Sequence, residues 1–246
     1  NHKNTPEDID KPGKAEKRPL GIPTIRDRIV QECVRIVLEP ILEAQFFEHS
    51  YGFRPMRDTH QALARVTDLV FRTGYFWIVE GDITNALTGS TTMPDKTALS
   101  HGHQGQTVLQ IIKAMMKAGI IGECEVNEKG TAGGVLSPLL ANVSLDILDQ
   151  WITSQWEQKK TRFPYKDWKG KSEGSVKGSR LIPGYLVRYA DDFVIITDSR
   201  EHAQSWKERL QQYLQAGTET RTIPGENADN DLRKQYIHFL GYEYKV

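Results

Sequence analysis

The most informative part of the sequence is Leu186–Thr197, LVRYADDFVIIT. Two apolar runs rich in β-branched residues, Leu186–Val187 and Phe193–Ile196, flank the polar pair Asp191 and Asp192. This pattern predicts a β-hairpin with both aspartates at its tip. Adjacent carboxylates at a turn either are simply solvated or hold a divalent cation, and this stretch alone favours the solvated turn.

A second acidic strand end lies about a hundred residues upstream. Residues 76–83 read FWIVEGDI, an apolar strand that ends at Asp82. We expect Asp82, Asp191 and Asp192 to meet at one face of a sheet. Carboxylate oxygens suit Mg²⁺, and a pair of such ions can clamp the attacking and leaving oxygens of a phosphoryl transfer.

These stretches resemble the palm of a reverse transcriptase, and they are most similar to the bacterial group II intron-encoded (retron-like) branch. The resemblance rests on five motifs in the family's order, which together cover most of the chain: RPLGIPTIRDRIVQ (18–31), YGFRP (51–55), GGVLSPLLAN (133–142), RYADD (188–192) and FLGY (239–242). It implies an α/β (α+β) right-hand polymerase fold of fingers and palm, with a small antiparallel palm sheet packed on helices.

The resemblance also implies an RNA-directed DNA polymerase. Asp82 and Asp191 are then expected to hold two Mg²⁺ ions, for which Mn²⁺ is a possible substitute. Asp192 is expected to be a supporting catalytic carboxylate that also lies at the metal site, and Ile83 lies at both the metal and the nucleotide positions. The implied partners are an RNA template, a DNA primer, a deoxynucleoside triphosphate (dNTP) and a group II intron RNA.

The basic pair that grips the incoming triphosphate in the family corresponds to Lys11 and Arg18, which bracket an expected hairpin around Pro12–Gly13. Lys supplies a point charge, whereas Arg binds phosphate oxygens with a bidentate fork. A solvated basic loop is the alternative interpretation.

The nucleotide site departs from the family at two positions. Leu87 stands where an aromatic normally excludes a 2′-hydroxyl, so discrimination against ribonucleotides is expected to weaken. Ala132 replaces the glutamine that normally contacts the nucleotide, just before Gly133. Gly133–Gly134 allows close approach of a ligand.

Apolar periodicity predicts several helices. The first lies within Asp27–His49, with a break or kink at Pro40, and its apolar residues (Ile29, Val30, Val34, Val37, Leu38, Ile41, Leu42 and Phe46) are expected to face the core. Further helices are expected at Gln61–Phe71, Thr107–Gly119, Ser137 to about Trp156, and Glu201–Gln215. Ser137 followed by Pro138 marks a helix start.

Three further segments have less specific patterns. The compact turn 51–55 contains Arg54, which reaches either template phosphate or a neighbouring acid. Residues 159–180 contain eight Lys or Arg against two acids, interleaved with aromatics. Such a segment either tracks a nucleic-acid backbone or is a solvated insertion. Tyr236–Tyr244 predicts a strand, a turn and a strand, which the resemblance assigns to primer support.

Composition sets only broad limits. The 246 residues carry 32 basic and 32 acidic side chains, so net charge says nothing about nucleic-acid binding. No apolar run is long enough to cross a bilayer, and no membrane partner is expected. Cys33 and Cys124 are expected to be free thiols in a reducing compartment, which fits a cytoplasmic, ribonucleoprotein-associated bacterial protein. The oligomeric state is not predicted.

The resemblance suggests fingers at 1–75 and palm at 76–246, with about 89–132 partly returning to the fingers. The helical thumb, the maturase region and an endonuclease are expected to be absent. Two other functions remain open. One is an RNA-binding maturase-type protein with a weakened polymerase site, motivated by Leu87 and Ala132. The other is an RNA-dependent RNA polymerase, disfavoured because that class typically has glycine where Ala190 stands.

Overall fold

The computed structural model describes the larger part of the chain. The described residues are 5–10, 17–83, 110–112, 114–115, 134–160, 165, 170–171, 181–217 and 230–246, with side chains described from residue 23 onward. Within them the chain forms two compact units, one of residues 1–46 and 85–145 and the other of 47–84 and 146–246. The boundaries differ from the predicted fingers and palm, and that assignment stays a prediction.

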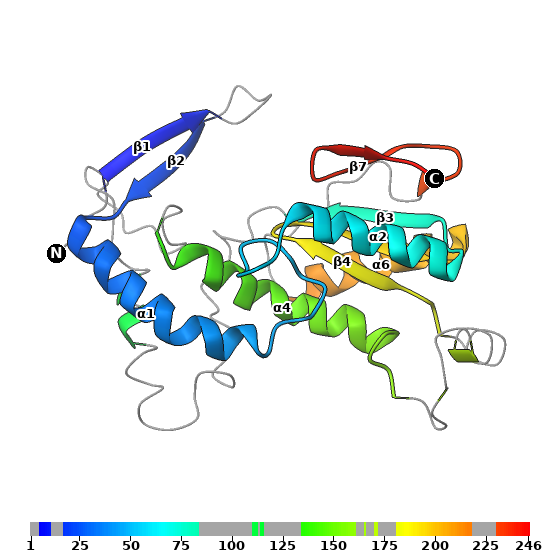
Figure 1. The fold of residues 1–246 in the computed structure, drawn as a ribbon, viewed down its shortest axis with the longest axis horizontal. Helices are drawn as coiled ribbons and strands as arrows, with labels where there is room; N and C mark the ends of the chain where they lie inside the picture. Colours follow the sequence, from blue (N-terminus) through cyan, green and yellow to red (C-terminus); the bar gives the residue numbers. More distant parts are fainter. Residues whose placement is uncertain are drawn as a thin grey trace. The chain divides into compact units, whose positions relative to one another are not determined.

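The first unit contains a hairpin and the helix that follows it. Strands β1 (Thr5–Asp10) and β2 (Lys17–Ile22) pair antiparallel, with Asp10 opposite Lys17 (Figure 1). The turn expected at Pro12–Gly13 between them lies outside the described residues. The polar sequence of the segment that forms β1, without apolar periodicity, predicts a loop or an extended tip. A short two-stranded ribbon of this kind needs no periodic apolar pattern, so the bounds of its strands could not be read from the sequence.

Helix α1 (Ile25–Glu43) is continuous through Pro40, where the sequence predicted a break or kink. Its buried residues are Gln31, Leu38 and Leu42. The expectation that its whole apolar set faces the core was wrong for Ile29, Val30, Val37 and Ile41, which are exposed. Apolar spacing marks a helix, but it does not say how many of its sides other elements cover.

The described residues of the first unit form one small apolar cluster. Leu38 and Leu42 of α1 pack with Phe46, with Ile112 from the predicted 107–119 helix, and with residues at the start of helix α4 (Ser137–Gln155). Residues 110–112 and 114–115 are helical, as predicted for that segment. The α4 residues in this cluster are Leu139 and Val143, preceded by Leu136. Helix α4 begins at Ser137, where the Ser–Pro pair predicted a start.

The second unit is built on a four-stranded antiparallel sheet in the order β4-β5-β3-β6. Its strands are β3 (Trp77–Asp82), β4 (Tyr185–Tyr189), β5 (Asp192–Thr197) and the short β6 (Asn230–Asp231). This is the small antiparallel sheet that the sequence predicted. A separate hairpin of β7 (Ile237–Phe239) and β8 (Tyr242–Tyr244) confirms the predicted strand, turn and strand.

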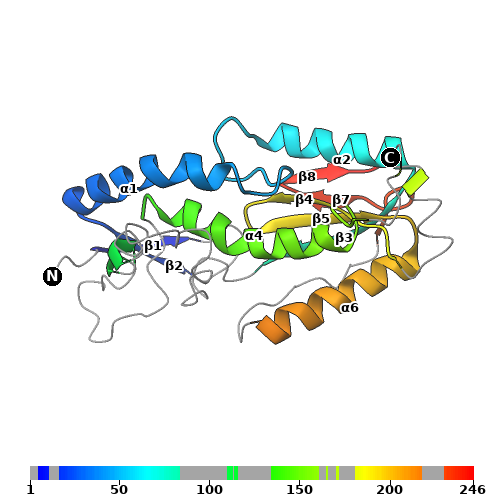
Figure 2. The same cartoon turned by 90° about the horizontal axis from the view of Figure 1, so that it is seen from below.

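Helices cover both faces of this sheet. Helix α2 (Thr59–Thr73) lies on one face and α6 (Arg200–Gly217) on the other (Figure 2). Asp58 caps α2 by accepting from the Gln61 N–H at 2.8 Å, and Gly74 ends it with a φ of 70°. Glycine suits that left-handed position because it has no Cβ to clash. Both helices occur where the sequence predicted them.

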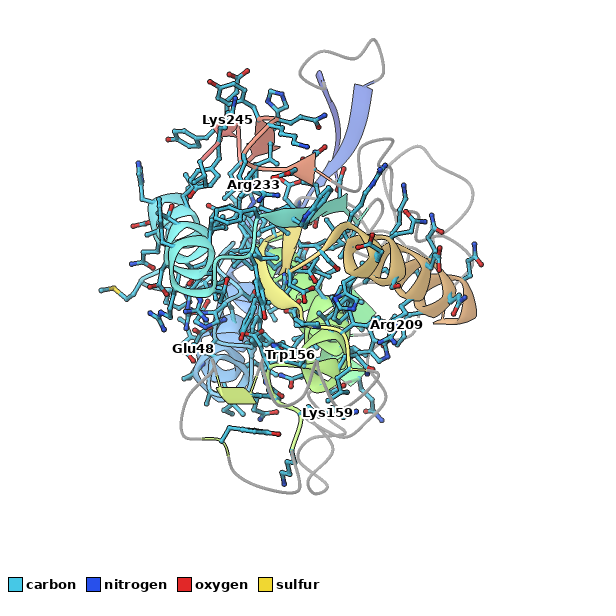
Figure 3. All side chains as sticks on the ribbon, turned by 90° about the vertical axis from the view of Figure 1, so that its right-hand side faces the viewer. Glu48, Trp156, Lys159, Arg209, Arg233 and Lys245 are labelled. Atoms are coloured by element: carbon cyan, nitrogen blue, oxygen red, sulfur yellow. The ribbon has the colours of Figure 1, made fainter. Side chains whose placement is uncertain are left out.

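Alternation along the strands distributes the core between these faces. Ile78, Val187, Val194 and Ile196 belong to one cluster with the apolar residues of α2. On the other face Trp206 of α6 is fully buried and donates from its indole to the carbonyl of Pro183 at 2.8 Å. The cluster that contains Ile78 and the residues of α2 also includes the fully buried Trp156, which lies in the interior in Figure 3. Lys245, by contrast, lies at the surface beside β8 in the same view.

Residue 81 of β3 must be glycine because the aromatic ring of Phe193 lies across it. It pairs with Phe193 of β5, and a Cβ at residue 81 would lie 2.3 Å from the ring atom Cζ of Phe193. Phe193 is 1% exposed, so its ring has little room to move. The aromatic covers the bare glycine backbone, and this contact fixes the register between the two central strands.

We predict that Gly81→Ala lowers the free energy of unfolding by about 1–3 kcal/mol, because the added methyl overpacks a buried aromatic contact. Urea denaturation of the single variant and of the same change in a Phe193→Leu background would measure it. The loss should be smaller in the Phe193→Leu background. Equal losses in both backgrounds would show that the Phe193 ring is not the group that excludes a side chain at residue 81.

Candidate active site

The register of β3 against β5 brings two aspartates together. Asp82, the last residue of β3, is the direct partner of Asp192, the first residue of β5. Side chains of directly opposed residues lie on the same face of a sheet, with Cβ atoms about 4.5–5.5 Å apart. Two carboxylates about a hundred residues apart in the sequence thus share one end of the sheet.

Asp191 joins them through the turn between β4 and β5. Its carbonyl accepts a hydrogen bond from the Ile83 N–H at 3.1 Å, which ties the turn to the residue just after Asp82. Ile83 itself is fully buried. All three aspartates that the sequence singled out therefore lie at one end of the central strands, together with the backbone of Ile83.

The turn itself differs by one residue from the prediction. Ala190 and Asp191 are its two central residues, and Asp192 already belongs to β5, opposite Tyr189. Ala190 has a φ of 53°. A positive φ at the first central residue alone is the pattern of a type II′ turn, where glycine is normally preferred. Alanine in this conformation is strained, so the surrounding structure must hold it there.

The YGFRP loop holds the strand that leads into this turn. The Arg188 N–H donates to the carbonyl of His49 at 3.0 Å, and the Tyr51 N–H donates to the carbonyl of Arg188 at 2.8 Å. Gly52 then lies directly against Ala190, because a Cβ at residue 52 would be 2.2 Å from the Ala190 nitrogen. Only glycine fits where two backbones approach so closely.

The buried side chain of Arg54 stabilises this loop through hydrogen bonds to its backbone. It is 6% exposed and donates from Nη1 to the carbonyls of Phe47 at 2.6 Å and Ser50 at 2.8 Å. The sequence left open whether Arg54 reaches template phosphate or a neighbouring acid. The structure shows a third arrangement, in which the guanidinium satisfies backbone carbonyls of the loop.

A buried ion pair on the opposite face of β4 was not foreseen. Arg188 donates from Nε to both carboxylate oxygens of Asp149, at 2.8 and 2.9 Å, and from Nη2 to Oδ2 at 2.7 Å. The two side chains are 1% and 0% exposed. An arginine inside an apolar strand was the available signal, because a charge so placed is rarely buried without a partner.

The site changes the ionisation of Asp192. Asp192 is exposed as a residue, but partial burial of its carboxyl group, with the nearby charges of Asp82 and Asp191, raises its pKa to about 6. Like charges at close range disfavour the ionised form. A cation bound there would relieve this repulsion.

The donor set fits a hard divalent cation in its chemistry. Asp82, Asp191 and Asp192 offer only oxygen, the ligand type that Mg²⁺ prefers. No group of three His, Cys, Asp or Glu side chains in the described part of the chain is arranged as a preformed metal cage. Mg²⁺ in phosphoryl-transfer sites is typically held by one or two carboxylates, with substrate phosphates and water completing its shell. Such a site needs no closed protein cage.

Several predicted nucleotide-site residues lie outside the described part of the chain: Lys11, Leu87, Ala132 and Gly133. Arg18 lies in β2 opposite Ile9. The neighbouring glycine loop is described from Gly134 onward. There Gln31 of α1 accepts from the Val135 N–H at 2.8 Å, so a buried amide supports the loop before α4.

The basic segment 159–180 is described only in part. Lys159 is exposed (Figure 3). Lys171 donates from Nζ to the carbonyls of Trp156 at 2.6 Å and Glu157 at 3.1 Å, and it lies over the Trp156 ring. The Lys171 ammonium therefore satisfies backbone carbonyls at the end of α4. The role of the rest of the segment stays a prediction.

Comparison with known proteins shows which family this sequence and fold match. Residues 9–243 match a sequence model described as reverse transcriptase (RNA-dependent DNA polymerase). The group II intron-encoded protein LtrA of Lactococcus lactis is 31% identical over 97% of this chain and 46% of its own length. Protein YkfC of Escherichia coli is 32% identical over 92% of this chain and 62% of its own length. The chain thus spans about half the length of these relatives.

A more distant relative and a solved structure widen the comparison. Nuclear intron maturase 2 of Arabidopsis thaliana is 26% identical over 90% of this chain and 34% of its own length. The apo telomerase of Candida tropicalis has a TM-score of 0.59 at 12% identity, covering 98% of this chain and 47% of that one. This structural likeness shows the fold alone. With the match over residues 9–243, the chain belongs to the reverse transcriptase (RNA-dependent DNA polymerase) family.

Proposed function

We propose that this chain carries the polymerase site of a group II intron-like reverse transcriptase. The single observation that supports this most strongly is the β3–β5 register, which sets Asp82 opposite Asp192 and beside Asp191. In the proposed reaction the primer 3′-oxygen loses its proton and bonds to the α-phosphorus of a dNTP. The bond from that phosphorus to the bridging oxygen breaks, and pyrophosphate leaves.

The three carboxylates would have distinct duties. Asp82 and Asp191, with the carbonyl of Ile83, would hold two Mg²⁺ ions, or Mn²⁺ in their place, and Asp192 would support them. Bound divalent cations stabilise negative charge on the attacking and leaving oxygens. Positioning and electrostatics dominate such transfers, so the rigid strand ends matter as much as the carboxylates.

The triphosphate and the sugar of the dNTP would contact the residues that the resemblance to the family predicts. Arg18 and Lys11 would neutralise the phosphates, and Gly133 would lie close to the nucleotide. Leu87 would discriminate weakly against a 2′-hydroxyl, and Ala132 would provide one contact fewer than the family's glutamine.

The partners follow from the same proposal. An RNA template, a DNA primer and dNTPs are the substrates, and a group II intron RNA is the element's own RNA. The protein is expected to lie in the bacterial cytoplasm, bound in a ribonucleoprotein. No helix in the described part of the chain has the length and apolar character needed to cross a membrane. Residues 1–75 would act as fingers and 76–246 as palm, with about 89–132 returning to the fingers.

A second candidate function is RNA binding in intron splicing with a weakened polymerase site. The replacements at Leu87 and Ala132 favour it, as does the similarity to a protein named as an intron maturase. This alternative predicts salt-sensitive RNA binding without nucleotide incorporation.

We predict that Asp191→Asn lowers Mg²⁺-dependent primer extension on an RNA template by at least about a hundredfold, because it removes a charge that would hold the catalytic cation, and loss of even one preorganised hydrogen-bond donor to a transition state costs about 10²–10³ in rate. Asp198→Asn is the matched control, since this aspartate lies just beyond the other end of β5, where it pairs with His202. The control should extend primers like the unaltered chain.

The outcomes separate the candidate functions. Extension that survives in Asp191→Asn would contradict the proposed site. No extension by the unaltered chain, with tight and salt-sensitive RNA binding, would favour the maturase-type function. Preference for ribonucleotides over deoxynucleotides would instead indicate an RNA polymerase.

The raised pKa of Asp192 predicts a pH-dependent stability without divalent ions. Because the folded state binds this proton more tightly than the unfolded chain, the contribution is full below the ordinary pKa of 3.8 and is lost as the pH rises through about 6. Asp192→Asn should therefore lose less stability than the unaltered chain between pH 4 and 7. We expect a difference below about 1 kcal/mol, since the residue is exposed and screened.

Thermal melts in chelator and in Mg²⁺ would measure this effect. Mg²⁺ should stabilise the unaltered chain more at pH 7.5 than at pH 5, because protonated Asp192 is a poor ligand. Equal stabilisation at both pH values, or an unchanged pH profile in Asp192→Asn, would count against the carboxylate cluster as a cation site.

A further inference from the structure

The Asp149–Arg188 ion pair has a connection to the catalytic turn that the proposed mechanism does not use. Besides its three bonds to Asp149, Arg188 donates from Nη1 to the carbonyl of Ala190 at 2.8 Å. Ala190 is the strained first residue of the turn, with its φ of 53°. One guanidinium therefore joins a helix to the residue that immediately precedes Asp191.

We infer that Asp149, acting through Arg188, is a positioning residue that fixes the Ala190–Asp191 turn and thereby sets the affinity of the carboxylate cluster for divalent cations. The inference deepens the proposed function and rests on it. Neither residue touches the reacting atoms.

Arginine suits this arrangement. Its planar fork offers five donors in a fixed geometry, so it binds a carboxylate through Nε and Nη2 and still presents Nη1 to a third acceptor. Asp149 lies on α4 and is fully buried, so the fork is anchored to a helix that packs in the core. The ammonium of lysine is one point charge and cannot hold both partners in the same fixed geometry.

The surroundings leave the turn few alternatives. Gly52 blocks movement of Ala190 toward the YGFRP loop, since even a Cβ does not fit there. Both backbone polar groups of Arg188 are bonded to the segment 49–51, the N–H to His49 and the carbonyl to Tyr51. Loss of the Nη1 bond would release the Ala190 carbonyl, so the strained φ could relax and carry Asp191 away from Asp82.

Two variants test the inference. Arg188→Lys keeps a charge beside Asp149 but removes the fixed bond to Ala190. The double change Asp149→Leu with Arg188→Met replaces the buried pair by apolar side chains of similar size, an exchange that other proteins tolerate or gain stability from. Arg233→Lys is the matched control, because Arg233 binds Asp231 with both bonds at 2.8 Å near the opposite end of β3.

The readouts are Mn²⁺ binding by electron paramagnetic resonance, Mg²⁺ dependence of primer extension, and thermal melting, all on the full chain. We expect both test variants to melt near the unaltered chain but to bind Mn²⁺ about tenfold more weakly, since groups that orient metal ligands contribute about 10–100-fold to affinity. The Mg²⁺ concentration for half-maximal extension should rise by the same factor. The extension rate at saturating Mg²⁺ should change much less, and Arg233→Lys should change neither.

Unchanged Mn²⁺ affinity and Mg²⁺ dependence in folded variants would overturn the inference. Unfolding of both variants would overturn it as well, because the pair would then be a requirement for folding and not for the position of the turn. Absence of Mn²⁺ binding and of extension in the unaltered chain would instead refute the proposed function, and the inference with it.

Discussion

The pairing of β3 with β5 is the constraint on which the site depends. Phe193 lies across Gly81, and one residue further along the same strands Asp192 lies opposite Asp82. A slip of one residue would move every side chain of a strand to the other face of the sheet. The apolar contact between ring and glycine therefore keeps the two carboxylates side by side.

Gathering three aspartates at one end of a sheet opposes folding in the absence of a cation, and partial burial together with the charges of Asp82 and Asp191 raises the pKa of Asp192. The turn adds strain, because Ala190 adopts a left-handed φ that costs an L-residue of order 1 kcal/mol. Rigid neighbours on both sides offset these costs. The YGFRP loop packs Gly52 against the turn, and the Asp149–Arg188 pair holds it from α4.

Strong local patterns made much of this fold predictable from sequence. The hairpin around Asp191, the strand ending at Asp82 and the helix starting at Ser137 each have clear signals, namely apolar runs beside turn residues and a Ser–Pro pair. The sequence could not show that Asp192 is already in β5, because the turn is set by the backbone of Ala190. Nor could periodicity show that Ile29 and Val37 of α1 are exposed, since burial depends on what packs against the helix.

The contacts that hold the site were the hardest to predict. Asp149 and Arg188 are 39 residues apart, and nothing local to either residue names its partner. The requirement for glycine at residue 52 was equally hidden, since it comes from contact with Ala190, far along the chain. Motif order indicated which residues gather, whereas the residues that keep them in place became visible only through tertiary packing.

The proposed site requires direct contact between a carboxylate and the catalytic cation, and this contact can be probed by exchanging the ligand atom. Asp82→Cys places a soft thiolate where a hard oxygen stands, and thiolates suit softer cations than Mg²⁺. Primer extension by this variant should fail with Mg²⁺ and recover in part when Mn²⁺ or Cd²⁺ is added, whereas Asp82→Ala should not recover with either. Full Mg²⁺-dependent extension by Asp82→Cys would contradict the account.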